Sequence, residues 1–588
     1  MSIEQTSSGT VTTVPASRMP TMRVVAIAAV VLLSLGIGAA LGAYLLRGSG
    51  PGFGAAGAYA PADTAYYVEM RVEPSAAQDA ALRELLGRFP EIEGIDLARP
   101  LADQLTERLD EAVAESGADI SWNDDVAPWF DGTIALAVTD VQPASAAPDP
   151  SQPFGSQGIL LLIGVTDPAA ATAAVERILA MSPAASEVTE SQHGGVTIRE
   201  VAGSGAYAVT DDQLVFAMTA DDVGKALDAR SSGSNLADSA KFAELTASLP
   251  ADWLVWGVYD MSGMLATALA GAGAASPEMT AAFEQLLAYQ PMRGAFAVSA
   301  SGDSIVMDGA SDLPTGPFAV TNADRGLADE IPGDALFYSE GGNIGPALAA
   351  VIEPLKAAFA ADPMMGQQLE TMEAALGAEL EDLFSWIGDG AMALGWDGTQ
   401  PYAGMVIIPN DMAAAQRRLG QLATFARLAA SDTASGIAVE ESIVGTLKIT
   451  AIRWEGPAPA APDPMMPAFT GVAVEYAITD ERVLIGVGDG FVARALELDS
   501  ADSMAETPRY TDAVAELGGA NNAGVMWLDL AGTREAVETA MAPMLEMMDT
   551  SGMYESDIRP WLMPLDRVVA VSRVDGDRLV QKGVLLFE

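Results

Sequence analysis

Short apolar stretches of two kinds follow one another along the chain after about residue 60. Residues 64–70 (TAYYVEM) are rich in side chains that strands prefer, and residues 159–165 (ILLLIGV) form the continuous apolar run of a buried strand. Between Leu101 and Val113, three leucines and the valine recur every four residues, which predicts a helix. Residues 294–307 predict a hairpin around a Gly-Asp turn. Many short strands joined by hairpins, with helices between them, predict an α+β fold with mainly antiparallel sheet.

The same order of elements starts again near Pro332. The sequence therefore predicts a duplication, with a first ectodomain repeat at 61–310, a linker at 311–331 and a second repeat at 332–588. The copies differ in length mainly in their loops, at 141–156 in the first and 455–467 in the second. The landmarks of the first copy and their matches in the second are Pro61, Asp63, Tyr67, Glu69, Trp129, Asp167 and Asp260 with Pro332, Asp334, Tyr338, Glu340, Trp386, Asp411 and Asp529.

Residues 24–46 are apolar, without charge, and long enough as a helix (roughly 34 Å) to cross a hydrocarbon core of roughly 30 Å. A cleaved signal peptide is the alternative, but its apolar part is shorter, and the best cleavage motif is followed by Pro61. We therefore expect a single transmembrane helix, after a disordered cytoplasmic tail at 1–23 and before a flexible, glycine-rich tether at 47–60. Arg18 and Arg23 precede the span and only Arg47 follows it, which predicts a cytoplasmic N-terminus and an extracellular ectodomain at the cell membrane.

Small residues recur every four positions on one face of the expected span, at Ser34, Gly38 and Gly42. Such spacing lets two helix backbones approach closely, which predicts a transmembrane packing face and a homodimer. Chance spacing in an alanine- and glycine-rich helix is the alternative interpretation.

The composition limits the partners and the chemistry. The chain has 80 acidic and 30 basic residues and a formal net charge of −50. Such a charge repels nucleic acid and anionic headgroups, so we expect no nucleic-acid partner. The absence of cysteine from the sequence excludes disulfides, thiol catalysis and cysteine-ligated metals.

Three segments, together with the N-terminal span, resemble a bacterial family. They are residues 61–67, residues 125–130 (DVAPWF) and residues 235–250 (NLADSAKFAELTASLP), the last of which precedes a strand with Trp and Tyr. The family is the membrane-anchored domain-of-unknown-function family number 3352. The resemblance implies a single-pass, extracytoplasmic protein and brings no catalytic residues with it.

Motifs for catalysis, nucleotide binding or metal binding are weak. The single histidine, His193, is followed by two glycines in an expected surface turn, and no nucleophile elbow accompanies it. Gly224-Lys225 lacks the glycine spacing of a phosphate loop. The acidic pairs at 124–125, 211–212 and 221–222 lack the spacing of a calcium loop and are interpreted as caps and turns. We therefore predict no catalytic, cofactor or metal site.

Methionines cluster towards the C-terminus, at Met541, Met544, Met547, Met548, Met553 and Met563. Core packing explains them most simply, and an apolar groove or a copper(I) site are alternatives. We expect a non-catalytic, membrane-anchored protein that acts by interaction, either as an envelope scaffold or by binding a partner protein. The alternative is a carrier or sensor of an apolar ligand in a cavity lined by Met and aromatic side chains, and an enzyme with carboxylate chemistry comes third.

Overall fold

The computed structural model describes residues 53–91, 95–115, 121–140, 158–180, 188–202, 205–262, 284, 287–360, 363–398, 400–431, 436–454, 472–488, 490–548 and 552–588. The fold is α+β with an antiparallel sheet, as the strand and helix patterns predicted. Residues up to 312 are called the first half below, and residues from 313 onward the second half.

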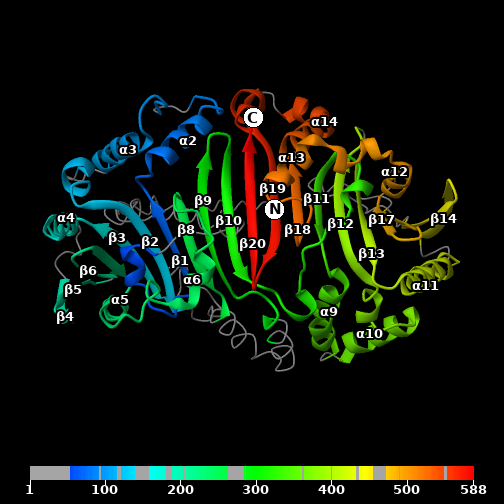
Figure 1. The fold of residues 1–588 in the computed structure, drawn as a ribbon, viewed down its shortest axis with the longest axis horizontal. Helices are drawn as coiled ribbons and strands as arrows, with labels where there is room; N and C mark the ends of the chain where they lie inside the picture. Colours follow the sequence, from blue (N-terminus) through cyan, green and yellow to red (C-terminus); the bar gives the residue numbers. More distant parts are fainter. Residues whose placement is uncertain are drawn as a thin grey trace, which may run out of the picture.

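One antiparallel sheet of twenty strands runs across both halves (Figure 1). From one end to the other, its strands pair in the order β4-β5-β6-β7-β3-β2-β1-β8-β9-β10-β20-β19-β18-β11-β12-β13-β17-β16-β15-β14. The strands of the first half are β1 Tyr66–Arg71, β2 Phe130–Asp140, β3 Gly158–Val165, β4 Val188–His193, β5 Val196–Val201, β6 Gly205–Val209, β7 Gln213–Ala217, β8 Val255–Asp260, β9 Arg293–Ser301 and β10 Ser304–Asp312. Those of the second half are β11 Ala335–Gly341, β12 Ile387–Trp396, β13 Pro401–Pro409, β14 Ile437–Val444, β15 Leu447–Trp454, β16 Val472–Ile478, β17 Val483–Val487, β18 Gly524–Asp529, β19 Leu565–Asp575 and β20 Arg578–Phe587.

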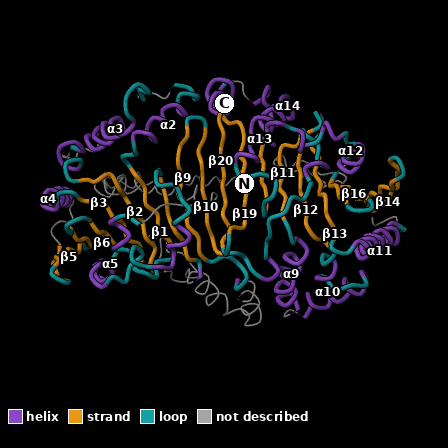
Figure 2. The backbone as a smooth tube through the Cα atoms, in the orientation of Figure 1, coloured by secondary structure: helices purple, strands orange, loops and turns teal. Residues whose placement is uncertain are grey.

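Helices lie around the rim and at both ends of the sheet (Figure 2). Short helical turns include η1 (Ala55–Ala58), η2 (Trp122–Val126), η4 (Ala240–Phe242), η5 (Gly316–Phe318) and η6 (Ala328–Glu330). The α-helices are α2 Ala76–Leu86, α3 Leu101–Glu115, α4 Pro168–Ala180, α5 Ala220–Ser232, α6 Ala243–Thr246, α9 Ile344–Ala360, α10 Pro363–Leu376, α11 Met412–Ala430, α12 Phe491–Glu497, α13 Pro508–Glu516, α14 Leu530–Met548 and α15 Arg559–Leu562.

The two halves share one order of strand pairing. In the first half β1 lies between β2 and β8, and in the second half β11 lies between β12 and β18. The helices that follow the matching strands are also related. Helices α2 and α3, which follow β1, lie at the top of the first half, and α9 and α10, which follow β11, lie at the bottom of the second half (Figure 2). A half-turn about an axis through the middle of the sheet produces this arrangement.

Strands β10 and β20 form the seam between the halves. Ser304 pairs with Leu586 at one end of the seam, and Asp312 pairs with Arg578 at the other. Asp308 and Lys582 are opposite each other at its centre. The two expected repeats are therefore parts of one continuous sheet and not separate bodies.

Each half buries apolar side chains on both faces of the sheet. Face A is the side on which Tyr67 and Tyr338 lie, and face B is the opposite side. In the first half α5 packs on the face A core and α4 on the face B core. In the second half α12 and α13 pack on the face A core and α11 on the face B core.

The expected tether at 47–60 is packed into the core from residue 53 onward. Ala56, Tyr59 and Ala60 are 3%, 3% and 0% exposed. Phe53 packs edge-on against the rings of Tyr67 (5.6 Å between centroids) and Trp256 (5.0 Å). The prediction of a flexible tether was therefore wrong for residues 53–60. The five glycines suggested flexibility, but small residues also allow a chain to lie close against a sheet.

The expected linker at 311–331 is ordered as well. Its first two residues end β10, and Leu327 and Ile331 are fully buried in the second half. Arg325 is 6% exposed; its guanidinium forms an ion pair with Asp389 and donates to the carbonyl oxygen of Asn522. This segment enters the second half as residues 53–60 enter the first, because Ala60 accepts a hydrogen bond from Leu236 N–H, and Ile331 accepts one from Met504 N–H.

Two local elements do not follow from the sequence pattern. Strand β4 has the sequence VTESQH, which is polar and exposed and carries no apolar signal. Residues 240–246 form a turn, η4, followed by the four-residue α6. The Ser239 side chain caps η4, and Pro250 follows closely, so a long helix is not maintained.

Candidate interaction site

The expected transmembrane helix at 24–46, with its packing face of Ser34, Gly38 and Gly42, lies outside the described residues. Within the part of the chain that the structure describes, no helix combines the length and the apolar character needed to cross a bilayer.

His193 and the acidic pairs take part in local structure. The His193 ring, at the end of β4, lies 2.7 Å (Nε2 to Oδ1) from Asp228 on α5. Asp125 forms an ion pair with Arg177, and Asp212 accepts a hydrogen bond from the Tyr59 hydroxyl. Among the described residues there is no group of three His, Cys, Asp or Glu side chains that could hold a metal ion.

The C-terminal methionines do not form a described groove. Met541 is half-buried on α14, and Met553 and Met563 are 54% and 44% exposed. The side chains of the other three, Met544, Met547 and Met548, lie outside the described residues.

A buried tyrosine–glutamate pair occurs at the same place in each half. The Tyr67 hydroxyl donates to the Glu69 carboxylate at 2.6 Å, and the Tyr338 hydroxyl donates to Glu340 at 2.7 Å. Burial raises the pKa of both glutamates, and the tyrosine hydrogen bonds oppose this shift. The Gly54 N–H also donates to Glu69, so this carboxylate holds the N-terminal segment in place.

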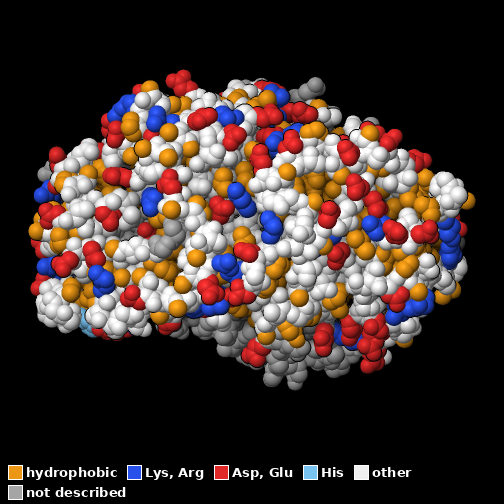
Figure 3. All heavy atoms as spheres, viewed as in Figure 1, with side chains coloured by type: hydrophobic (Ala, Val, Ile, Leu, Met, Phe, Trp, Pro, Cys, Tyr) orange, Lys and Arg blue, Asp and Glu red, His pale blue; other side chains and the backbone are white. Residues whose placement is uncertain are grey.

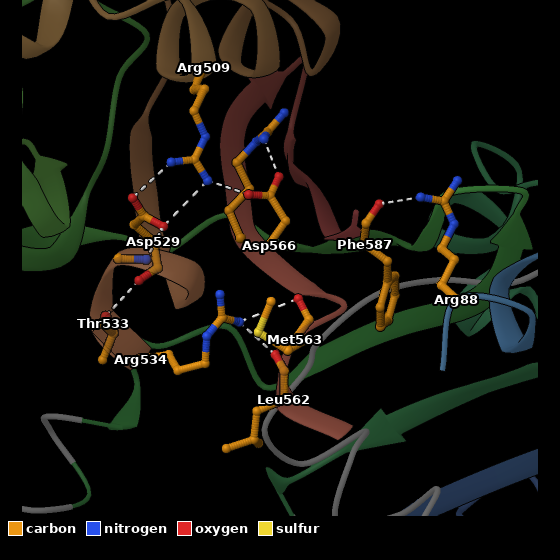
Figure 4. A network of polar contacts seen from close by, with 11 residues as sticks. Arg88, Arg509, Asp529, Thr533, Arg534, Leu562, Met563, Asp566 and Phe587 are labelled. Carbon is orange, nitrogen blue, oxygen red and sulfur yellow. Dashed lines mark hydrogen bonds and ion pairs between the residues drawn. The ribbon is translucent and has the colours of Figure 1, made fainter. Parts of the chain in front are cut away.

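A second network joins the elements near the C-terminus (Figure 4). Arg509 on α13 forms ion pairs with Asp529 at the end of β18 and with Asp566 on β19. Across the seam, Arg88 of the first half donates to the carbonyl oxygen of Phe587 on β20 at 2.7 Å. Each of these groups has a structural partner, so the network holds strands together and does not present a reactive group.

The strongest unpartnered feature of the described residues is the end of the sheet at β14, which lies opposite the β4 end (Figure 1). Ile443 on β14 is 74% exposed, and Leu428 on α11 is 70% exposed. These are the two most exposed large hydrophobic side chains of the described residues. Arg427 of α11 forms an ion pair with Glu441 of β14, so the helix and the strand present one joint surface. We call this surface the β14 end; its apolar residues are Leu428 and Ile443.

An open groove of about 500 Å³ runs beside β14. Its lining residues lie mainly on face A of β14, β15 and β16: Glu440, Glu441, Ser442, Ile449, Ala451, Arg453 and Glu475. Glu440 forms an ion pair with Arg453 at 2.9 Å, and buried Glu475 accepts a hydrogen bond from Val492 N–H of α12. The groove is therefore lined by matched charges beside apolar side chains.

The β4 end is built differently. Strand β4 presents polar, exposed side chains, and the residue in the place of Ile443, counted from the hairpin turn, is Gln192. Helix α4 has 13 residues where α11 has 19, and α5 has 13 where α12 has 7. The extra turns of α11 supply Leu428, and α12 covers less of face A than α5 does. The sequence pattern did not single out Leu428 or Ile443, because an apolar residue looks the same in the sequence whether or not another segment covers it.

The surface charge is acidic in both halves. Figure 3 shows Asp and Glu side chains spread over the whole face in view. At a net charge of −50, the molecule attracts cationic partners and repels anionic ones.

Comparisons with known proteins identify a family and no function. No curated protein matches the chain. The crystal structures found include crystal forms III and I of TP0453, with TM-scores of 0.22 and 0.20 and sequence identities of 10% and 9%. Each alignment covers 45% of this chain and 81% of the other, and likeness at this level supports no conclusion about fold or function. The sequence profile of one family matches residues 25–553. The chain therefore belongs to the family described as protein of unknown function, DUF3352.

Proposed function

We propose that this protein is a non-catalytic interaction scaffold, held at the cell membrane by residues 24–46, that binds a partner protein through the β14 end. One observation carries the proposal: Ile443 and Leu428 are 74% and 70% exposed on a strand and a helix that the Arg427–Glu441 ion pair joins, whereas the β4 end presents polar side chains. Exposed apolar groups that gather on one surface are typical of interaction sites.

The shared strand order of the two halves supports an origin by duplication. After a duplication, the two ends of the sheet begin alike, so a difference between them marks a change in one copy. The longer α11, the shorter α12 and the exposed Ile443 of β14 all fall at the same end. Three changes at one place favour a docking surface over scattered drift.

Site-specific photocrosslinking in the native cell tests the proposal. A photoreactive amino acid at Ile443 is expected to yield a discrete protein adduct, and the same amino acid at Gln192 is the matched control. The change Leu428→Asp is expected to abolish the adduct formed at position 443. No adduct at position 443, or equal adducts at both positions, contradicts the proposal.

The membrane anchor has its own test. Protease added to intact cells is expected to digest the C-terminal part of the chain, because the basic flanks predict that this part lies outside the cell. Protection of that part until the cells are lysed contradicts the proposed topology.

A carrier of an apolar ligand is the second candidate, and a different surface favours it. On face B of the second half, Met392, Leu394 and Met526 are 43%, 45% and 37% exposed. Met526 and Met392 both pair with Ser339, so they lie in one row across three adjacent strands. Native mass spectrometry of a chain that begins at Phe53, purified without detergent, tests this candidate. Reproducible bound lipid that is lost in Met392→Glu supports the carrier, and a clean ligand-free mass contradicts it.

A further inference from the structure

Between Val439 and Ile443, no described strand pairs with the outer side of the β14 backbone. Strand β14 pairs with β15 through a hairpin whose two-residue turn is Gly445-Thr446. No other described strand pairs with β14. In a hairpin with such a turn, backbone pairing alternates along the strand. Ser442 and Glu440 therefore bond to β15, and the N–H and C=O groups of Val439, Glu441 and Ile443 point outward.

Within the part of the chain that the structure describes, this edge lacks three features that normally protect an edge strand, namely lysine, proline and a bulge. Natural edges are blunted by lysine, proline, bulges or a covering element. Strand β14 (IAVEESIV) has no proline or lysine, and its register with β15 has no bulge. The charge of Glu441 is matched by Arg427 and Lys448. The outward-pointing backbone groups therefore lie beside the β-branched side chains of Val439 and Ile443, and the net charge around Glu441 is small.

The edge on β4 is an internal comparison. The residues of β4 that stand in the places of Glu441 and Ile443 are Glu190 and Gln192. Strand β4 is polar along its exposed length, so strand addition there gains little apolar contact. The two edges therefore differ in the exposed apolar side chains that an added strand could contact.

We infer that the β14 edge, with the groove beside it, binds an extended, positively charged peptide segment of a partner protein, which adds to the sheet as one more strand. This inference rests on the proposed function and specifies how the partner binds. Backbone hydrogen bonds to Val439, Glu441 and Ile443 hold the strand, and alternate side chains contact Ile443 on face B and the groove on face A. The net charge of −50 selects a cationic segment and repels a second copy of this chain.

Peptide binding to the full-length protein in detergent micelles tests the inference. The probe is a capped eight-residue peptide of alternating valine and lysine, measured by fluorescence anisotropy. We expect saturable binding that weakens as salt rises, and no binding of a valine–glutamate peptide. A valine–lysine peptide with a methylated backbone is also expected not to bind, because it cannot complete the ladder.

A matched pair of proline variants locates the binding edge. Glu441→Pro removes one outward N–H without breaking the β14–β15 ladder, and Glu190→Pro does the same on β4. We expect Glu441→Pro to weaken binding by about tenfold or more and Glu190→Pro to leave it unchanged. Glu441→Gln, which removes only the charge, is expected to change affinity much less than the proline does. Equal binding by Glu441→Pro and the unchanged protein overturns the inference.

Hydrogen exchange of the unchanged protein keeps the test valid if a proline variant fails to fold. The amides of Val439, Glu441 and Ile443 are expected to exchange fast alone and slowly with the peptide. Slow exchange without peptide that depends on protein concentration identifies a second copy as the occupant and overturns the inference. A photocrosslink at Ile443 without peptide binding leaves the proposed function standing and rejects strand addition, whereas a missing crosslink rejects the proposed function itself.

Discussion

At the scale of single residues, buried polar groups hold the segment that precedes the first half, residues 53–60. Glu69 is 4% exposed and is bonded by the Tyr67 hydroxyl and by the N–H of Gly54. Burial also raises the pKa of Tyr59 to about 12, and the Tyr59 hydroxyl donates to Asp212 at 2.5 Å. These groups attach residues 53–60 to the sheet, so the N-terminal segment is part of the folded unit.

The raised pKa of Glu69 predicts a pH dependence of stability. The folded chain binds this proton more tightly than the unfolded chain, so the free energy of unfolding falls as pH rises from about 4 through the folded pKa. Glu69→Gln removes this titration, so the decline measured by urea unfolding at a series of pH values should become shallower. The exposed Glu200→Gln is the control and should keep the slope of the unchanged protein. An unchanged slope in Glu69→Gln contradicts the prediction.

At the scale of elements, two contacts join parts of the chain into one folded unit. One is the packing of residues 53–60 against the first half, and the other is the β10–β20 seam. Asp308 and Lys582 are opposite each other at the centre of the seam. Burial raises the pKa of Asp308, and the charge of Lys582 opposes this shift. The central pair of the seam, about which the other pairs are arranged symmetrically, therefore carries opposite charges.

Charge exchange at the seam tests this pair. Asp308→Lys places two lysines opposite each other, and Lys582→Asp places two aspartates there. Each change should lower the free energy of unfolding by about 1 kcal/mol, and the double exchange should restore most of the loss. Urea unfolding of the four proteins measures the coupling. Additive losses in the double variant mean that the pair does not interact.

Truncation tests the N-terminal segment. A chain that begins at Phe53 should fold with the stability of the full-length protein. A chain that begins at Pro61 lacks the buried Tyr59 and Ala60 and the ring of Phe53, so it should lose on the order of 3–5 kcal/mol. Urea unfolding of the two chains gives the difference. Equal stability means that residues 53–60 do not stabilise the fold.

At the scale of the whole molecule, the continuous sheet makes the halves depend on each other. Separating them exposes β10 on one piece and β20 on the other as unprotected edges. The repeated order of landmarks was readable in the sequence because each match, such as Tyr67 with Tyr338, is local. The seam was not readable, because antiparallel pairing of β10 with β20 joins positions far apart in the chain.

Splitting the chain after Asp312 tests this dependence. The two pieces should associate on mixing, because β10 and β20 complete each other and Asp308 again lies opposite Lys582. Each piece alone should self-associate less well, since like charges then face each other at the centre of the seam. Size-exclusion chromatography with light scattering distinguishes the mixed pair from the separate pieces. Pieces that stay monomeric on mixing contradict the prediction.

The sequence alone determined the α+β class, the antiparallel pairing of neighbouring strands and the repeated landmarks, because each of these depends on local periodicity and on nearby turns. It also determined the family, through segments such as residues 125–130. Only the tertiary structure decided that residues 53–60 pack into the core, that β10 and β20 join the halves, and that Ile443 and Leu428 are exposed. The physical reason is that local patterns show which side chains are apolar, whereas burial depends on which distant segment covers them. An apolar residue such as Ile443 reads like a core position until the sheet ends beside it.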